Sequence, residues 1–166
     1  MSDPPSSSST ATRKWSVSSH TPKRFQGFSL AHKFFTLAEA NRTLPLVKRI
    51  VQDLMAVYPQ WKDLVAQYEL IAAKARPESG ESREQLALKA HIDGVASKIN
   101  GFLGELELIG CEFKGFDEGL VDFHGRLDAR EILWCWKFGE ERITHWHELE
   151  AGFAGRQPLP EVLSRT

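Results

Sequence analysis

The stretch VKRIVQDLMAVYPQWKDLVAQYELIAAKA, residues 47–75, decides the fold. Apolar side chains recur in it at alternating steps of three and four residues: Val47, Ile50, Leu54, Val57, Trp61, Leu64, Tyr68, Ile71 and Ala75. This heptad spacing is typical of a helix that packs along another helix. Pro59 lies inside the stretch without changing its phase, so we predict one kinked helix rather than two helices.

A second helix of the same kind follows a short turn. Residues 76–81 have the composition of a turn, and Ser82 opens a capping box with Gln85. The apolar spacing then continues through Leu88, Ile92, Val95, Ile99, Phe102, Leu106 and Ile109. Two helices of about 33 and 28 residues would be about 50 and 42 Å long. Because the turn between them is short, they must lie antiparallel.

A further capping box, Thr36 with Glu39, precedes the heptad stretch. Proline disfavours helical geometry in the residue before it and suits the first turn of a helix. We therefore expect a short helix that ends at Leu44 and a new helix that begins at Pro45.

Beyond Gly110 the period changes from helical to alternating. We expect strands over residues 111–114, 120–123, 132–138 and 143–148. Residues 139–142 read as a turn, and residues 152–160 as an irregular terminal segment. The predicted fold class is therefore α+β: a long antiparallel, coiled-coil-like helical hairpin over residues 34–110, followed by a small antiparallel β-meander within residues 111–160.

Composition and charge narrow the class of protein. The chain has 166 residues, of which 42% are hydrophobic and 26% charged, as expected of one globular domain over residues 34–166. The net charge of −1 gives no overall attraction to nucleic acid. No apolar run is long enough to span a bilayer, and the two cysteines favour a reducing, cytoplasmic setting. We expect the Ser-rich, basic residues 1–33 to be a disordered tail; an organelle transit peptide is the alternative.

Several motifs in the C-terminal part occur together in one known family. They are GLVDF (119–123), RLD (126–128), RE (130–131) leading into LWCW (133–136), and WHELEAGFAGRQPL (146–159). This pattern resembles the bacterial family catalogued as domain of unknown function 2203, and FTLAEAN (35–41) is similar to the start of that family. The resemblance spans residues 34–159 and implies a bacterial cytoplasmic protein without an assigned activity. Two departures are the Ser-rich tail and His124, where we expect proline.

Two histidines form the first candidate site. His145 and His147 would share one face of a strand, where they could bind a metal ion such as zinc or iron, with His124 as a third ligand. We favour a structural interpretation, with His145 on the surface and His147 hydrogen-bonded inside. His147 alone could also carry a proton near neutral pH.

Alternating charges form the second candidate site, at Asp122, Arg126, Asp128 and Arg130. We favour ion pairs that brace a loop; the alternative is a pocket in which arginines hold a carboxylate or phosphate, joined by Arg156. The aromatic residues Phe123, Trp134, Trp136, Phe138, Trp146 and Phe153 read as core, or as the wall of a binding site. Cys135 lies in a core strand, where a thiol is usually inert.

Two functional hypotheses follow. We favour a homodimeric interaction module, in which two hairpins form a four-helix bundle and a polar and aromatic C-terminal patch binds a protein or small molecule. The alternative is a small metal-binding protein or enzyme; no cofactor other than a divalent metal ion is indicated, and nucleic-acid binding is not expected. The candidate ligand-binding residues are Asp122, Arg126, Asp128, Arg130, Trp146, His147, Glu148 and Arg156.

Overall fold

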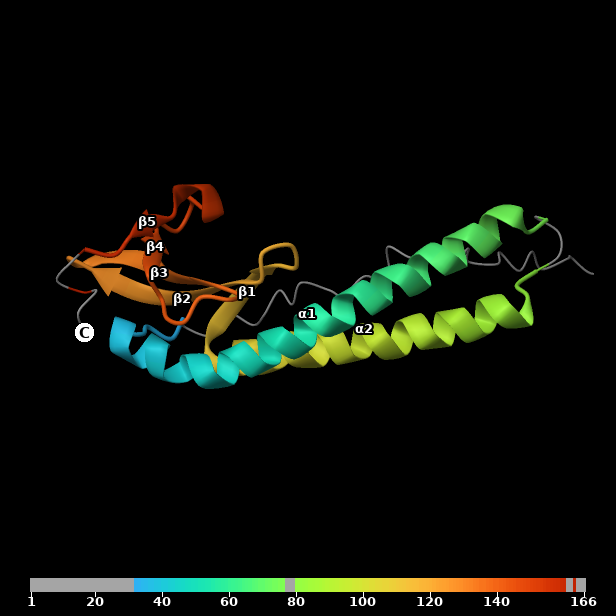
Figure 1. The fold of residues 1–166 in the computed structure, drawn as a ribbon, viewed down its shortest axis with the longest axis horizontal. Coiled ribbons are helices and arrows are strands. Elements are labelled where there is room, and N and C mark those ends of the chain that lie inside the picture. The colour runs from blue at the N-terminus through green and yellow to red at the C-terminus, as the bar shows by residue number, and fades with distance from the viewer. Residues whose placement is uncertain (1–31, 77–79, 161–162, 164–166) are drawn as a thin grey trace, which may run out of the picture.

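A computed structural model describes residues 32–76, 80–160 and 163 of the chain (Figure 1). The protein consists of two long packed helices followed by a five-stranded antiparallel sheet, which confirms the predicted α+β class. The disordered tail predicted at the N-terminus falls on residues 1–31, which lie outside the described residues. The division of the chain into a tail and one domain stays a prediction.

The two helices form the predicted hairpin. Helix α1 spans Leu37–Lys74 and helix α2 spans Arg83–Ile109. At the start of α1, the Thr36 hydroxyl accepts a hydrogen bond from the Glu39 amide (3.2 Å), and the Glu39 carboxylate accepts one from the Thr36 amide (2.8 Å). A second capping box begins α2, which ends at Gly110 with the left-handed φ of 99° that glycine adopts readily.

The expected break at Pro45 was wrong, because α1 continues through both Pro45 and Pro59 without interruption. Leu44 and Val47, on either side of the first proline, are both buried on the face of α1 that meets the core, while Pro45 is exposed. A proline inside a helix costs about 3 kcal/mol. The burial of one large apolar side chain on each side of Pro45 contributes a free energy of the size needed to offset that cost. The prediction of one helix through Pro59 is confirmed.

The sheet follows the helices in simple chain order. Its strands are β1 (Cys111–Gly115), β2 (Leu120–Leu127), β3 (Arg130–Lys137), β4 (His145–His147) and β5 (Gln157–Pro158). Neighbours in this order pair antiparallel. The first four strands lie where strands were predicted, but β2 continues to Leu127, so Arg126 belongs to a strand and not to the expected loop. A short 3₁₀ helix, η2 (Phe153–Gly155), precedes β5.

One strand was not predicted. Strand β5 has only two residues, one of which is Pro158, and it lies in the segment that we expected to be irregular. A two-residue strand has no periodicity to detect, and proline has no amide hydrogen to donate to a ladder.

Buried side chains form two cores. The first lies between the sheet, the N-terminal half of α1 and the end of α2, and it includes Phe123, Trp134 and Trp136. The second lies between the two helices further along the hairpin, which projects away from the sheet (Figure 1). Within the described residues, neither helix combines the length and the hydropathy needed to cross a membrane.

The sheet has one apolar and one polar face. Residues at alternate positions of β2 and β3 join the first core, whereas their neighbours point to the opposite side. We call this opposite side the polar face; it carries Glu112, Asp122, His124, Leu133, Cys135, His145 and His147. Buried polar groups are rare in proteins unless they have partners, so this face is the place to look for a site.

Candidate functional site

Three buried side chains from three neighbouring strands meet on the polar face: Asp122 of β2, Cys135 of β3 and His147 of β4. One potential ligand atom from each lies within 4.8 Å of the other two. The exposed fractions of the three residues are 2%, 1% and 2%. Asp122 and Cys135 are direct partners in the β2–β3 ladder, and His147 is one row along, opposite Leu133. Strand register therefore builds this triad.

The hydrogen bonds of His147 fix its tautomer. Its Nδ1 lies 2.8 Å from the backbone carbonyl oxygen of Glu148, which can only accept, so Nδ1 carries the proton and donates it. Its Nε2 faces Oδ2 of Asp122 at 3.3 Å. The interaction with Asp122 raises the pKa of His147, burial lowers it, and the Glu148 carbonyl raises it further. Between Nε2 and the Asp122 carboxylate there is thus a place for either a proton or a metal ion.

Asp122 has spare capacity to accept. Its second oxygen, Oδ1, is buried and has no hydrogen-bond partner within the described part of the chain. A buried carboxylate oxygen without a partner is costly in free energy. Such an atom needs an explanation, and a cation in contact with it is one.

Cys135 is not an activated nucleophile. Burial raises the pKa of its thiol to about 12, and the adjacent Asp122 carboxylate contributes in the same direction, while Arg156 acts against both. The thiol is therefore protonated near neutral pH, and thiolate is the form that attacks electrophiles. A buried Cys–His pair of this kind does not suit cysteine hydrolase chemistry.

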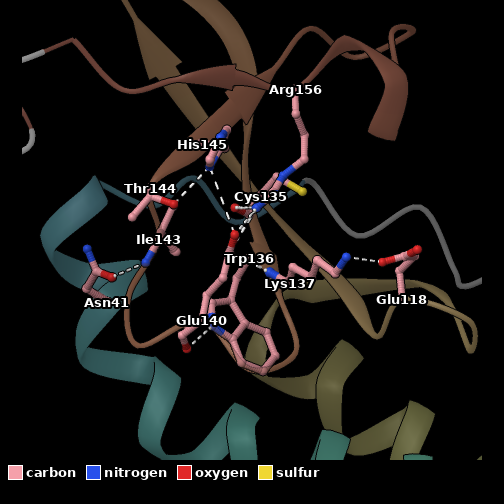
Figure 2. A network of polar contacts seen from close by, with 10 residues as sticks. All are labelled: Asn41, Glu118, Cys135, Trp136, Lys137, Glu140, Ile143, Thr144, His145 and Arg156. Atoms are coloured by element: carbon pink, nitrogen blue, oxygen red, sulfur yellow. Dashed lines mark hydrogen bonds and ion pairs between the residues drawn. The ribbon is translucent and has the colours of Figure 1, made fainter.

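Arg156 reaches Cys135, one member of the triad, from the C-terminal segment (Figure 2). Its Nη2 donates to both carboxylate oxygens of Glu140, at 2.9 and 2.8 Å, and to the backbone carbonyl of Cys135 at 3.3 Å. Only 11% of the Arg156 side chain is exposed. The sequence pointed to Arg156 but missed Glu140, because nothing in the turn GEER (139–142) marks which of its two glutamates points inward.

The other charged candidates do not join the triad. Arg126 pairs with Glu131 and Arg130 with Glu148, in both cases between largely exposed side chains. Asp128 is exposed and has a φ of 50° in the two-residue turn between β2 and β3. Trp146 belongs to the apolar core on the other face. These side chains are arranged as surface pairs and turn residues.

The two candidate histidines of β4 have different surroundings. His147 is buried with Asp122 and Cys135, whereas His145 is half-buried, and its Nδ1 lies 2.8 Å from the Thr144 hydroxyl. Cys135, which no sequence pattern marks as a ligand, takes the place expected for a second histidine.

A second group of possible ligands lies beside the triad. Nε2 of His124 is 3.1 Å from the Glu112 carboxylate, and the His32 ring stacks on that of His124 with centroids 4.0 Å apart. Burial would raise the pKa of Glu112, but hydrogen bonds from Lys114 and His124 lower it to about 2. Stacked imidazoles cannot both direct in-plane lone pairs at one ion, and Lys114 already neutralises the carboxylate. This group is better described as an ion-pair cluster.

The sequence profile of an uncharacterised conserved protein family, DUF2203, matches residues 33–159. The chain belongs to the DUF2203 family. This result confirms the resemblance in the C-terminal motifs. No curated protein and no solved structure matches the chain.

In this DUF2203 protein the triad thus combines one imidazole nitrogen, one sulfur and one carboxylate oxygen. These are the three donor types that zinc accepts in proteins, and a mixture of them also suits other late first-row transition metals. Calcium and magnesium prefer sites made of oxygen atoms alone. The three side chains therefore have the donor atoms that a transition-metal ion needs.

Proposed function

We propose that this DUF2203 protein binds a divalent transition-metal ion, of which zinc fits best, through Asp122, Cys135 and His147. The observation that carries the proposal is the convergence of three different donor atoms, within 4.8 Å of one another, on side chains that are almost fully buried. Exposed acidic groups often lie together by chance. A buried imidazole and carboxylate beside a thiol are less common, since the imidazole and the carboxylate are each costly to bury without a partner.

One distance within the triad has the length expected between two ligands of a tetrahedral ion. Zinc lies about 2.0–2.2 Å from nitrogen and oxygen ligands and about 2.3 Å from sulfur, so the ligands themselves are about 3.3–3.7 Å apart. Nε2 of His147 and Oδ2 of Asp122 are 3.3 Å apart, which is the edge of such a tetrahedron. The same distance is long for a charge-assisted hydrogen bond, which is typically about 2.7–2.9 Å.

The surroundings also suit a cation. His147 donates its Nδ1 proton to a backbone carbonyl, as metal-bound histidines usually do, and this leaves Nε2 available. The carboxylate of Asp122 and the thiolate form of Cys135 would balance the charge of a divalent ion, while Arg156 and Glu140 balance each other. Three protein ligands would leave a fourth position for water or a small anion.

Elemental analysis tests the proposal. We expect about one zinc ion per chain in untagged protein expressed with zinc and dialysed, and a loss of most of it in Cys135→Ser, His147→Gln and Asp122→Asn. His145→Gln is the matched control, because His145 lies on the same strand outside the triad. The proposal fails if the wild type takes up no metal, or if folded triad variants keep the wild-type content.

Self-association is a second proposed function. Four leucines on the two helices are more than half exposed: Leu46, Leu70, Leu86 and Leu108, the last at 90%. A second hairpin could cover them and form the four-helix bundle that the heptad spacing suggests. Sedimentation equilibrium tests this proposal, and a monomer at high micromolar concentration would refute it.

Both cysteines are free thiols and buried, which supports a cytoplasmic setting.

A further inference from the structure

The segment that follows β4, residues 148–159, meets the polar face through the Glu148 carbonyl, which accepts from His147, and through the Arg156 side chain. We call this segment the strap. At its far end, β5 pairs with β4, and the buried Leu159 donates its amide to the Thr144 carbonyl at 2.9 Å. Residues 148–154 are all exposed, and apart from the Glu148 carbonyl, which accepts from Nδ1 of His147, their backbone hydrogen bonds are made within the strap. The strap therefore makes few contacts with the rest of the protein that would hold it in place.

Arg156 is the one strap side chain that reaches the triad. Figure 2 shows it extending from the strap to Cys135, with the Glu140 carboxylate beside it. Its guanidinium hydrogen-bonds the Glu140 side chain and the backbone carbonyl of Cys135. The two partners are 11% and 24% exposed, so solvent screens this ion pair less than the surface pairs nearby.

The strap has the backbone features of a movable segment. Gly152 has a φ of 58°, which glycine adopts without strain, and it stands at the start of η2. Beyond η2, the two-residue β5 adds few hydrogen bonds. Opening residues 149–156, while Glu148 keeps its contacts with His147 and Arg130, would mainly require the Arg156–Glu140 pair and the contact of Lys137 with the Phe153 ring to separate.

We propose that the Arg156–Glu140 pair is a latch that holds the strap closed over the Asp122–Cys135–His147 site and controls how fast a metal ion enters and leaves. This inference rests on the proposed function. None of the three ligands belongs to the strap, since they lie on β2, β3 and β4. Opening the latch therefore changes access to the site more than the ligand set, so it changes rates more than stoichiometry.

The first test is the rate at which zinc-loaded protein gives up its ion to excess of a chromophoric chelator. We expect release to be about tenfold faster in Arg156→Gln and in Glu140→Gln, as loss of one charge-assisted hydrogen bond implies. Arg142→Gln and Glu141→Gln are matched controls on the same turn, where both side chains are exposed. Arg156→Lys should restore part of the slow release. Unchanged rates in both latch variants would overturn the proposal.

A second test does not need the metal. We measure alkylation of Cys135 by iodoacetamide in metal-free native protein, with the buried Cys111 as an internal control. Arg156→Gln should increase labelling of Cys135 about tenfold and leave Cys111 unchanged. Because the guanidinium lowers the pKa of the Cys135 thiol, its removal alone would slow labelling, so a faster reaction reports access.

The two tests separate the two proposals. If the wild type takes up no zinc but Arg156→Gln still exposes Cys135, the metal proposal fails and the latch stands as the closure of a buried site. If zinc binds but neither release nor labelling responds to the latch variants, the latch is wrong and the metal site stands. An equal rise in labelling of both cysteines would indicate general loosening, and would also overturn the latch.

Discussion

The two ends of the hairpin are built from the same helices but have different surroundings. At the sheet end, α1 and α2 pack on five strands, and the first core lies between them. In the projecting part, which we call the arm (residues 54–76 and 80–99), the helices pack mainly on each other, and near the sheet also on Phe113 and Phe116. The sheet end buries Asp122, His124 and His147, whereas the arm buries one polar side chain, Gln85, of its capping box. The buried polar side chains of the sheet end thus lie on the polar face of the sheet.

This difference favours the sheet end as the location of the proposed site. The arm needs only an apolar seam and the Ser82 capping box to form, and its sequence contains little else that is buried. At the sheet end, buried charge is not needed for a core of this size, so its presence there calls for a partner such as a cation. Four matched comparisons test how far the two ends differ.

The largest expected effect is the loss of a core tryptophan at each end. Trp136 is fully buried, and its Nε1 donates to the Glu140 carbonyl, so Trp136→Ala should lower the free energy of unfolding by about 3–5 kcal/mol. Trp61 in the arm has a buried Nε1 with no partner among the described residues, and its removal relieves that group. Trp61→Ala should therefore cost only about 1–3 kcal/mol in a urea titration. Equal losses would mean that the two cores are not distinct.

The same glycine-to-alanine change should have opposite signs at the two ends. A Cβ on Gly125 would lie 2.1 Å from Nε1 of Trp134, whose hydrogen bond to the Phe35 carbonyl would be disturbed, so Gly125→Ala should cost about 1–3 kcal/mol. A Cβ on Gly94, in the middle of α2, would meet nothing within 4 Å. Gly94→Ala should add about 0.5–1 kcal/mol. Thermal unfolding of both variants measures this difference, and a stabilising Gly125→Ala would contradict the close packing.

Loss of each of the two capping boxes should destabilise a different part of the structure. Replacing either cap residue by alanine costs about 1 kcal/mol. Thr36 stands where α1 meets the sheet, so Thr36→Ala should lower the stability of the whole sheet end. Ser82 caps the outer end of α2, so Ser82→Ala should mainly increase hydrogen exchange in the first turns of that helix. Equal changes in amide exchange throughout both variants would show that the arm and the sheet end unfold as one unit.

The smallest expected effect concerns an ion pair at the outer end of the arm. Hydrogen bonds from Lys89 and Tyr68 lower the pKa of Glu81. Because the folded pKa lies below the unfolded one, the contribution of Glu81 is present at neutral pH and is lost as the pH falls through the folded value. An NMR titration of Lys89→Met should show the Glu81 pKa closer to its ordinary value, with the exposed Lys98→Met as control. Since Glu81 is exposed, we expect little change in overall stability.

The sequence was sufficient for the hairpin but not for the site. Heptad spacing, capping boxes and Gly110 act locally, so both helices and their antiparallel arrangement could be predicted from neighbouring residues. Pro45 misled us, because its local preference was outweighed by burial of Leu44 and Val47 in a core that only the folded sheet provides.

The triad depends on contacts that no local pattern records. Asp122 and His147 could be chosen as candidates, since each stands out by residue type. Cys135 could not, because its position beside them follows from the register between β2 and β3 and between β3 and β4. The polar side chains that the sequence grouped with them, Arg126, Asp128 and Arg130, lie near the β2–β3 turn, several residues along the ladder. In this antiparallel sheet, residues that are close to Asp122 in sequence do not lie beside it in space.

The arm also acts as a spacer of adjustable length. From residue 54 to the end of α1 it measures about 30 Å at 1.5 Å per residue. Because its seam repeats every seven residues, adding one heptad to each helix would lengthen it by about 10 Å and leave the same face toward each neighbour. Whatever contacts the tip of the arm is thereby held at a set distance from the buried triad, and evolution can change that distance without rebuilding the sheet end.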